Sequence, residues 1–455
     1  MTAHRPMVLN AFCMNTVSHL QHGLWVRPDS RQREFNRLDP WLDLARLLER
    51  GGFDTIFLAD VAGISDVHGG GPDAALRHAV QLPVNDPAML IPAMATATEH
   101  LGFAFTSSVL QTPPFTFARQ ATTLDHLTGG RIAWNIVTSH LASTARNLGF
   151  DALVPHDERY ERAEEYLEVV AKLWEGSWED GAVLADLDTQ VYADPARVHA
   201  IDHHGRFYDV AGPFVCEPSP QRTPVLFQAG ASERGREFAA KHAEGVFVVA
   251  SRRNLPALRA DIAARAVRYG RRPADLLFCQ GLTPVVGGTE AEAHAKADEY
   301  RAQLSFEGGV VQMSGMVGVD LSDIDPDRPI DELRTDAIQS ILNGVQRAGP
   351  AGTQTFADLV RAAMTGQFAV GTPEQLADLL ESWQHAGADG FNIMHSVLPA
   401  SFVDFVDGVV PVLRARGLVR DHYEPGPLRQ KLFGAARLPD RHPDAAFRVR
   451  RAPLA

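Results

Sequence analysis

A closed (β/α)8 TIM barrel is the fold class that the sequence predicts for this chain of 455 residues. Eight short apolar runs alternate with loops and with segments of helical periodicity, which is the repeating unit of a parallel sheet. The runs are almost continuously apolar, as parallel strands are when both faces of the sheet are covered. Eight such units favour a closed barrel over an open doubly wound sheet.

The first half of the chain contains four of these units. Asp39-Pro40 and Asp86-Pro87 each place a capping residue before a proline at the start of a helix. A Gly-Gly turn, Gly129-Gly130, leads into the fourth apolar run. We therefore expect strands at 7–14, 54–59, 101–105 and 131–137, and helices at about 39–50, 86–99, 115–127 and from about 156.

Two insertions interrupt the second half. The first, at about 176–223, is irregular, with an expected hairpin at 203–214. The second, at about 305–352, is rich in glycine and aspartate and lacks periodicity. Strands are expected at 224–230, 245–250, 276–287 and 390–396. The chain is predicted to form one domain, residues 1–455, and its extended tail from about 424 is expected to pack along the surface or against a second subunit.

Composition narrows the class of protein. A net charge of −13 argues against nucleic acid or an anionic membrane as the main partner. The three cysteines, Cys13, Cys216 and Cys279, form no C-x-x-C pair, which is typical of reduced thiols. We see no clear signal peptide and no apolar stretch of about 20 residues. The expectation is a soluble, cytoplasmic protein.

Several motifs of known chemistry are absent from the sequence. It contains no G-x-G-x-x-G after a strand, no P-loop and no G-x-S-x-G nucleophile elbow. It also lacks H-E-x-x-H, and no H-x-H closes the first strand. The sequence therefore predicts no metal site and gives no support to a Rossmann dinucleotide site or a serine hydrolase.

Polar residues instead gather where the predicted strands end. Asp60, Thr106 and Asn135 lie at three strand ends, and Ser232 follows a fourth. In a barrel these ends converge on one mouth, where a cofactor would lie. Each residue alone could equally be a cap or a turn residue.

Two further features of the sequence could form a binding site for an anion such as phosphate. The segment QAGAS, 228–232, puts small residues and a serine at a helix N-terminus, where free N–H groups can face an anion. A plain N-cap at Ser232 explains the same segment equally well. His156 and Tyr160 are four apart on one helix face and could reach a phosphate, or could be a surface pair beside the charged run DERYERAEEY.

At these residues the chain resembles a known family. The matching segments include FDTIFLAD, FARQATTLDHLTGGRIAWNIVTS, HDERYERAEEYLEVVAKLWEGSW and PVLFQAGASERGREFA. They are similar to the bacterial-luciferase-like flavin monooxygenases, in the branch of nitrilotriacetate monooxygenase, pristinamycin synthase and dibenzothiophene-sulfone monooxygenase. The resemblance spans nearly the whole chain.

The resemblance implies a luciferase-like barrel and an FMN-dependent, two-component monooxygenase that acts through a flavin peroxide. A separate NAD(P)H:flavin reductase would supply FMNH2, and O2 would be the co-substrate. The family also suggests a homodimer or homotetramer. Carried over by position, the cofactor-binding residues are Asp60, Thr106 and Asn135 at the flavin ring, and His156, Tyr160, Ala231 and Ser232 at the ribityl-phosphate.

The substrate side is less defined. His19, just after the first strand, is the candidate acid/base group, although a lone loop histidine is more often structural. Phe12, Trp25, Gln312 and Met316 are the candidate substrate-binding residues, and they suggest a small organic substrate that is apolar, aromatic or organosulfur. The same scaffold could perform other oxygen chemistry, such as C–N or C–halogen cleavage, or bind flavin without turnover.

Overall fold

The computed structural model describes residues 5–230, 232–332 and 355–449. Eight parallel strands form a closed barrel in the order β10-β9-β4-β3-β2-β1-β13-β11, and pairing of β11 with β10 closes it. The predicted fold class is therefore confirmed. The barrel strands are β1 (Val8–Met14), β2 (Thr55–Ala59), β3 (Gly102–Ser108), β4 (Ile132–Val137), β9 (Val225–Gln228), β10 (Gly245–Val248), β11 (Leu277–Val286) and β13 (Gly390–Met394).

All eight predicted strands are present, with ends that differ by a few residues. The largest difference is in β3, which continues through Thr106 to Ser108 rather than ending at 105. Apart from the hairpin strands of the first insertion, one further strand outside the barrel was not predicted in the described residues. It is β12 (Phe368–Gly371), which pairs with the second half of β11.

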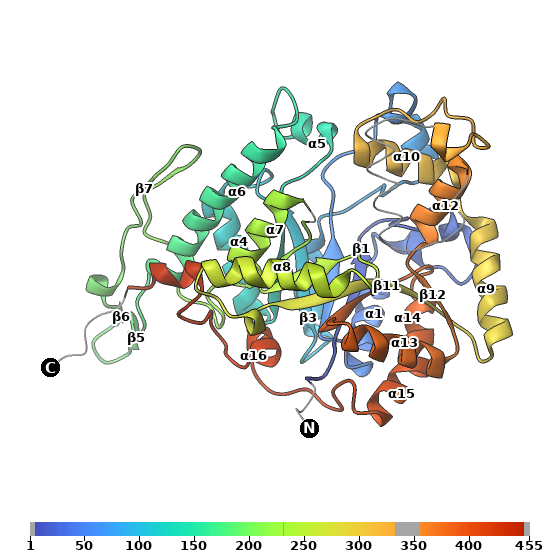
Figure 1. The fold of residues 1–455 in the computed structure, drawn as a ribbon. Helices are drawn as coiled ribbons and strands as arrows, with labels where there is room; N and C mark the ends of the chain where they lie inside the picture. Colours follow the sequence, from blue (N-terminus) through green and yellow to red (C-terminus); the bar gives the residue numbers. More distant parts are fainter. Residues whose placement is uncertain (1–4, 231, 333–354, 450–455) are drawn as a thin grey trace.

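The longer helices surround the barrel, and the smaller ones lie mainly in its loops (Figure 1). In the described part of the chain, no helix combines the length and the apolar character needed to cross a membrane. The helices are α1 (Asp39–Arg50), α2 (Asp73–Arg77), α3 (Ile91–Thr96), α4 (Pro114–Leu127), α5 (Ala142–Asn147), α6 (His156–Ala171), α7 (Glu233–His242), α8 (Leu255–Arg268), α9 (Glu290–Gln303), α10 (Phe306–Val317), α12 (Phe356–Thr365), α13 (Pro373–His385), α14 (Ala400–Asp404), α15 (Val410–Ala415) and α16 (Leu428–Phe433).

Two of the three predicted helix caps are confirmed. Asp86 accepts a hydrogen bond from the Ala88 amide at 2.9 Å, and Ser232 caps α7. The cap predicted at Asp39 is wrong, because α1 starts one residue earlier, at Asp39 itself, after a Leu38 without a side-chain cap. The Asp39 carboxylate instead pairs with Arg31 and Arg37.

The first insertion folds into two hairpins that project from one side of the barrel (Figure 1). They pair β5 (Val183–Asp186) with β6 (Val191–Ala193), and β7 (His203–His204) with β8 (Asp209–Val210). The second of these confirms the hairpin predicted at 203–214.

The prediction that the second insertion lacks periodicity is wrong for its first part, which forms α10. The glycines of α10 allow close packing: a Cβ atom on Gly308 would lie 2.9 Å from His22 Cβ, and one on Gly315 would lie 2.5 Å from Ser65 Oγ. Helix α10 therefore lies against the loops that follow β1 and β2, at the carboxyl ends of the strands. Residues 333–354 of the insertion lie outside the described residues.

The C-terminal tail does more than cover the surface. Leu428 and Leu432 of α16 are buried and pack into the barrel interior with Val8 and Phe57. The amide of Leu428 donates a hydrogen bond to the carbonyl oxygen of Gly130, at the turn before β4. The prediction of a surface tail is therefore wrong for α16, which closes the amino-terminal end of the barrel.

Candidate active site

A cleft lies at the carboxyl ends of β2, β3, β4 and β9. It has a volume of about 290 Å³. Four of the residues predicted to bind the cofactor line it: Asp60, Thr106, His156 and Tyr160. The chain thus brings together residues up to 100 positions apart because parallel strands end at the same edge of the barrel.

At one end of the cleft, polar groups from three neighbouring strands converge. Asn135 Nδ2 donates a hydrogen bond of 2.8 Å to Thr106 Oγ1. The amide oxygen of Asn135 is buried and accepts no hydrogen bond from the described residues. Gln111 donates to Asp60 Oδ2 at 3.4 Å, and burial raises the pKa of Asp60 to about 6.

At the other end, the cleft meets the N-terminus of α7. Ser232 Oγ accepts a hydrogen bond of 3.0 Å from the Gly235 amide, so the N-cap predicted there is confirmed. A Cβ atom on Gly230 or on Gly235 would lie only 3.0 or 2.8 Å from the Tyr160 hydroxyl oxygen. The two glycines therefore let that hydroxyl approach the helix start. Burial raises the pKa of Tyr160, although its hydrogen bond to Ser232 acts in the opposite sense.

His156 and Tyr160 share a helix face, as their spacing predicts. Their ring centroids are 5.2 Å apart. Tyr160 is buried, whereas the side chain of His156 is about half exposed and pairs with Asp157. Ala231 lies outside the described residues, so its predicted role has no structural description here.

The sequence reasoning missed Arg159. Its side chain is 8% exposed and lines the cleft, and its Nε atom has no hydrogen-bond partner. Arg159 forms no ion pair with any residue that the structure describes, and burial lowers its pKa. A buried, unpaired cation calls for an anion. Helical spacing could have revealed it, since Arg159 precedes Tyr160 and lies four residues before Ala163 on the buried face of α6.

Gln228 and Ser108 were not among the predicted site residues, although Gln228 begins the segment 228–232 that was predicted to face an anion. Both line the cleft, and the side-chain oxygen of Gln228 is buried without a hydrogen-bond partner. Gln228 is the last residue of β9, and Ser108 is the last residue of β3. The same strand-end reasoning that found Thr106 would have found both if the strand boundaries had been predicted more closely.

His19 and Phe12 lie in a different part of the mouth, beside β1 and β13. The His19 side chain is buried, and its ring is 4.9 Å from the Phe12 ring. Burial lowers the pKa of His19 well below its usual value, and His395 and His22 lower it further. His19 is therefore neutral near pH 7.

The other predicted substrate residues are less closely grouped. Gln312 Oε1 on α10 accepts a hydrogen bond of 3.0 Å from Nε2 of His22, which lies three residues beyond His19. Trp25 lies in a short helix, Leu24–Val26, and is half-buried. The Met316 side chain is 66% exposed on α10. None of these three residues is among the described residues that line the cleft at the ends of β2, β3, β4 and β9.

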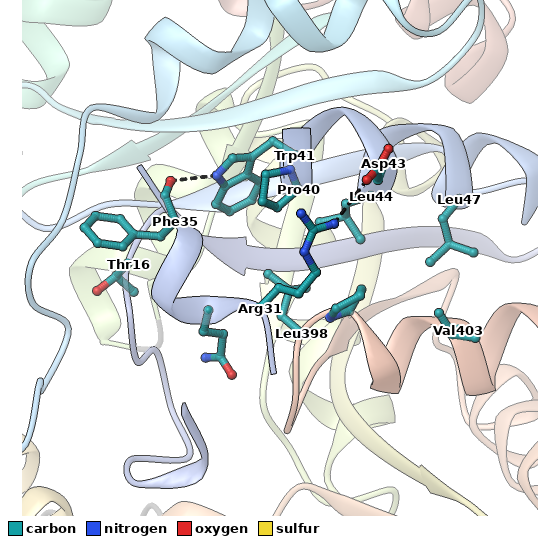
Figure 2. A pocket seen from close by; sticks show the side chains of 12 residues that line it. Thr16, Arg31, Phe35, Pro40, Trp41, Asp43, Leu44, Leu47, Leu398 and Val403 are labelled. Carbon is teal, nitrogen blue, oxygen red and sulfur yellow. Dashed lines mark hydrogen bonds and ion pairs between the residues drawn. The ribbon is translucent and has the colours of Figure 1, made fainter. Parts of the chain in front are cut away.

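A second pocket, of about 220 Å³, lies outside the barrel wall between α1 and the segment after β13 (Figure 2). Its walls are mainly apolar and include Leu44, Leu47 and Val403. Two of its polar groups are engaged: Trp41 donates to the Phe35 carbonyl at 2.8 Å, and Arg31 pairs with Asp43 at 3.1 Å. Thr16, which also lines the pocket, has a hydroxyl group without a hydrogen-bond partner among the described residues.

The fold and the cleft define a class of protein. A parallel barrel carries a cleft with a buried cation, a helix N-terminus and unpaired amide oxygens at the strand ends, which suits an anionic organic cofactor. Within residues 5–230, 232–332 and 355–449, no group of three or more His, Cys, Asp or Glu side chains is arranged to hold a metal ion. Cofactor-dependent chemistry at the barrel mouth is the class that this arrangement supports.

Comparison with known proteins identifies the family. Residues 14–390 match the model of the luciferase-like monooxygenase family, and the chain belongs to this family. It is 47% identical over 446 residues to the long-chain alkane monooxygenase of Geobacillus thermodenitrificans (strain NG80-2), covering 97% of each chain. It is 44% identical over 449 residues to the dimethyl-sulfide monooxygenase of Hyphomicrobium sulfonivorans, covering 97% of this chain and 94% of that one.

A solved structure extends the range of activities among similar proteins. The crystal structure of a riboflavin lyase with modified FMN and riboflavin superposes with a TM-score of 0.90 at 36% identity, over 98% of this chain and all of that one. Proteins with this barrel fold that are similar to the chain therefore include some named monooxygenases and one named a lyase.

Proposed function

We propose that this protein is the oxygenating component of a two-component system. It takes FMNH2 from a separate NAD(P)H:flavin reductase and uses O2 to oxidise a small organic substrate of apolar, aromatic or organosulfur character. The observation that carries the proposal is the cleft lined by Asp60, Thr106, Arg159 and Tyr160, in which the buried guanidinium of Arg159 has no ion-pair partner among the described residues.

The residues fit the cofactor along the length of the cleft. Unpaired oxygens of Asn135 and Gln228 are acceptors that suit the N–H and hydroxyl groups of a flavin. The buried guanidinium of Arg159 and the N-terminus of α7 suit its phosphate. The close approach of Gly230 to the Tyr160 hydroxyl suits a cradle in which backbone and side chain share one anion.

In this proposal the chain's own residues bind and orient the cofactor. Asp60, Thr106 and Asn135 hold the ring end, while Tyr160 and Ser232 hold the phosphate end. Reduced FMN, when bound, supplies the two electrons needed to place one oxygen atom of O2 in the substrate and the other in water. Because the pKa of Asp60 is raised by burial to about 6, this carboxylate ionises only near neutral pH and adds its negative charge there.

Other residues control water and protons. Helix α10 packs over the loops that follow β1 and β2, and such a cover would keep water from the reacting centre. The neutral ring of His19 holds one proton on one nitrogen and accepts a hydrogen bond at the other. It is the candidate to exchange a proton with the transferred oxygen.

The names of similar proteins support the substrate class. Two of them are named for a long-chain alkane and for dimethyl sulfide, and both of these compounds are uncharged. The similar riboflavin lyase favours a second candidate, in which the same flavin scaffold performs bond-cleaving oxygen chemistry.

The deciding experiment is a panel of alkanes, thioethers and aromatic compounds with enzymatically supplied FMNH2 under ¹⁸O₂, scored by product mass. One labelled oxygen atom in a product supports the proposal, and cleavage products without label support the second candidate. Consumption of O2 that no substrate changes would contradict both.

The flavin assignment has its own test. Tyr160→Phe combined with Ser232→Ala should weaken FMNH2 binding by roughly tenfold or more, because two hydrogen-bonding groups at the phosphate are lost. Equilibrium dialysis under anaerobic conditions measures this. An unchanged affinity would refute the placement of the phosphate.

A further inference from the structure

Buried polar side chains without partners gather where β1 and β13 end. These strands are neighbours, with Phe12 opposite Met394. Asn15 Oδ1 and Thr16 Oγ1 follow β1, and both ring nitrogens of His395 follow β13. None of these atoms has a hydrogen-bond partner among the described residues. All three side chains are at most 5% exposed.

His395 is the most unusual member of this group. Buried polar groups are nearly always hydrogen-bonded, because an unpaired one forfeits its interaction with water. An imidazole carries two such groups, and both are unpaired here. The ring is packed among other rings instead: its centroid is 5.8 Å from that of Phe402 and 6.3 Å from that of His19.

The distance between the two histidine rings is informative. A centroid separation of 6.3 Å is longer than a direct N–H···N hydrogen bond between two imidazoles allows. It is comparable with the distance expected if one ligand atom lay between the two rings and formed a hydrogen bond with each of them. The aromatic rings of Phe12 and Phe247, 5.0 Å apart, continue from His19 into the barrel and form an apolar floor.

Electrostatics restricts what could lie there. Burial alone lowers the pKa of His395 to about 4, and no charged side chain of the described residues contributes to this shift. Burial and two other histidines lower the pKa of His19. Both rings are neutral near pH 7, so neither attracts an anion by charge. A carboxylate placed there would lose its hydration without gaining a counterion.

We propose that His395 contacts the substrate, and that together with His19 it selects an uncharged molecule with an apolar body and one hydrogen-bonding oxygen, as in a primary alcohol. This inference rests on the proposed function, because it assumes that the barrel mouth holds the substrate. It assigns the β1–β13 side of the mouth to the substrate and leaves the β2–β3–β4–β9 side to the flavin. It also excludes aminopolycarboxylates as substrates.

The test compares 1-hexanol with hexanoate, which have the same chain length but differ in charge. Binding to the full-length protein saturated with oxidised FMN is followed by NMR of ¹⁵N-labelled histidine rings. The signals of His395 are assigned by their loss in His395→Gln. We expect 1-hexanol to shift these signals and to bind at least ~tenfold more tightly than hexanoate.

Two substitutions separate hydrogen bonding from shape. His395→Phe should weaken 1-hexanol binding by roughly three- to tenfold, because one hydrogen bond is lost while the ring volume is kept. His395→Gln, which retains a donor and an acceptor, should stay within about twofold of the wild-type affinity. His126→Phe, at an exposed site on α4, is the matched control and should have no effect.

The outcomes distinguish this inference from the proposed function. FMN affinity, measured by flavin fluorescence, should be the same in wild type and both His395 variants. Failure of wild type to bind FMN would contradict the proposed function itself. Normal FMN binding with equal affinities for 1-hexanol and hexanoate, or with no loss in His395→Phe, would overturn the role of His395.

Discussion

Asp60 lines the cleft at the carboxyl ends of β2, β3, β4 and β9, and the fold changes its ionisation. Burial raises its pKa from 3.8 to about 6, so the folded protein binds more protons than the unfolded chain between about pH 4 and pH 6. Stability therefore falls as pH rises through this window and stays lower above it. The carboxylate is thus a destabilising feature of the flavin-free protein at neutral pH, as expected of a group retained for a ligand.

Asp60→Asn should remove this pH-dependent loss. We expect the variant to be more stable than wild type by about 1–2 kcal/mol at pH 7.5, with the full shift discounted because the side chain is partly solvated. At pH 4 the two proteins should be equally stable. Urea unfolding at both values measures the difference, with Asp188→Asn in an exposed turn as control. A constant difference at both values would show that ionisation is not the cause.

The cleft at the ends of β2, β3, β4 and β9 is lined by four of the predicted cofactor residues and by none of the predicted substrate residues. Asp60, Thr106 and Tyr160 were found because strand ends and helix starts carry recognisable signals. Arg159 was missed because its neighbours are charged, which made the whole run resemble a solvated face. His395 was missed because it lies one residue beyond a strand whose predicted end, 396, already included it.

Among the elements, α16 shows how a short helix at the end of the chain stabilises the barrel. Arg429 is fully buried there and forms a two-point ion pair with Glu244, at 2.8 and 2.9 Å. Its guanidinium also donates to the carbonyl oxygens of Thr223 and Pro224, just before β9. The tail is therefore bound to backbone groups at the amino-terminal end of the barrel that no strand satisfies.

Arg429→Ala should destabilise the protein by about 3–5 kcal/mol, because Glu244 would remain as an uncompensated buried charge. Arg437→Ala is the matched control in the same tail: its ion pair with Asp180 is largely exposed, so a loss of at most about 1 kcal/mol is expected. Denaturant unfolding measures both. Similar losses in the two variants would mean that α16 does not hold the barrel closed.

Helix α10 shows where sequence patterns give the wrong result. Four glycines in and just after it lower its intrinsic helix propensity, so the segment was predicted to be irregular. The structure shows why glycine is needed: at Gly309, a Cβ atom would lie 2.7 Å from Val360 Cγ1. Close packing compensates for the weak propensity. Contacts made across the fold are not visible in the local sequence, and for this reason the helix could not be predicted.

At the scale of the whole molecule, the closed barrel was predicted because alternation of strands and helices is a local property repeated eight times. The closure of its amino-terminal end by α16 was not predicted. It depends on contacts between residues about 400 positions apart in the sequence, such as Leu428 and Val8. The barrel is therefore closed at the amino-terminal end by the tail and open at the carboxyl ends of the strands. A ligand that binds at those ends should therefore raise the free energy of unfolding of the whole protein.

The coupling between ligand binding and stability gives a test of the proposed phosphate site. The test changes both the ligand, from FMN to riboflavin, and the protein, from wild type to Arg159→Gln. A ligand that binds only the folded state stabilises it by about 2.7 kcal/mol at a concentration of 100 times its Kd. FMN should therefore raise the thermal unfolding midpoint more than riboflavin, which lacks the phosphate, at equal concentration. In Arg159→Gln, the advantage of FMN over riboflavin should largely disappear, since the cation that faces the phosphate is gone. The difference in wild type should also shrink with added salt. If the advantage of FMN survives the substitution unchanged, Arg159 does not bind the phosphate, and its buried charge needs another partner.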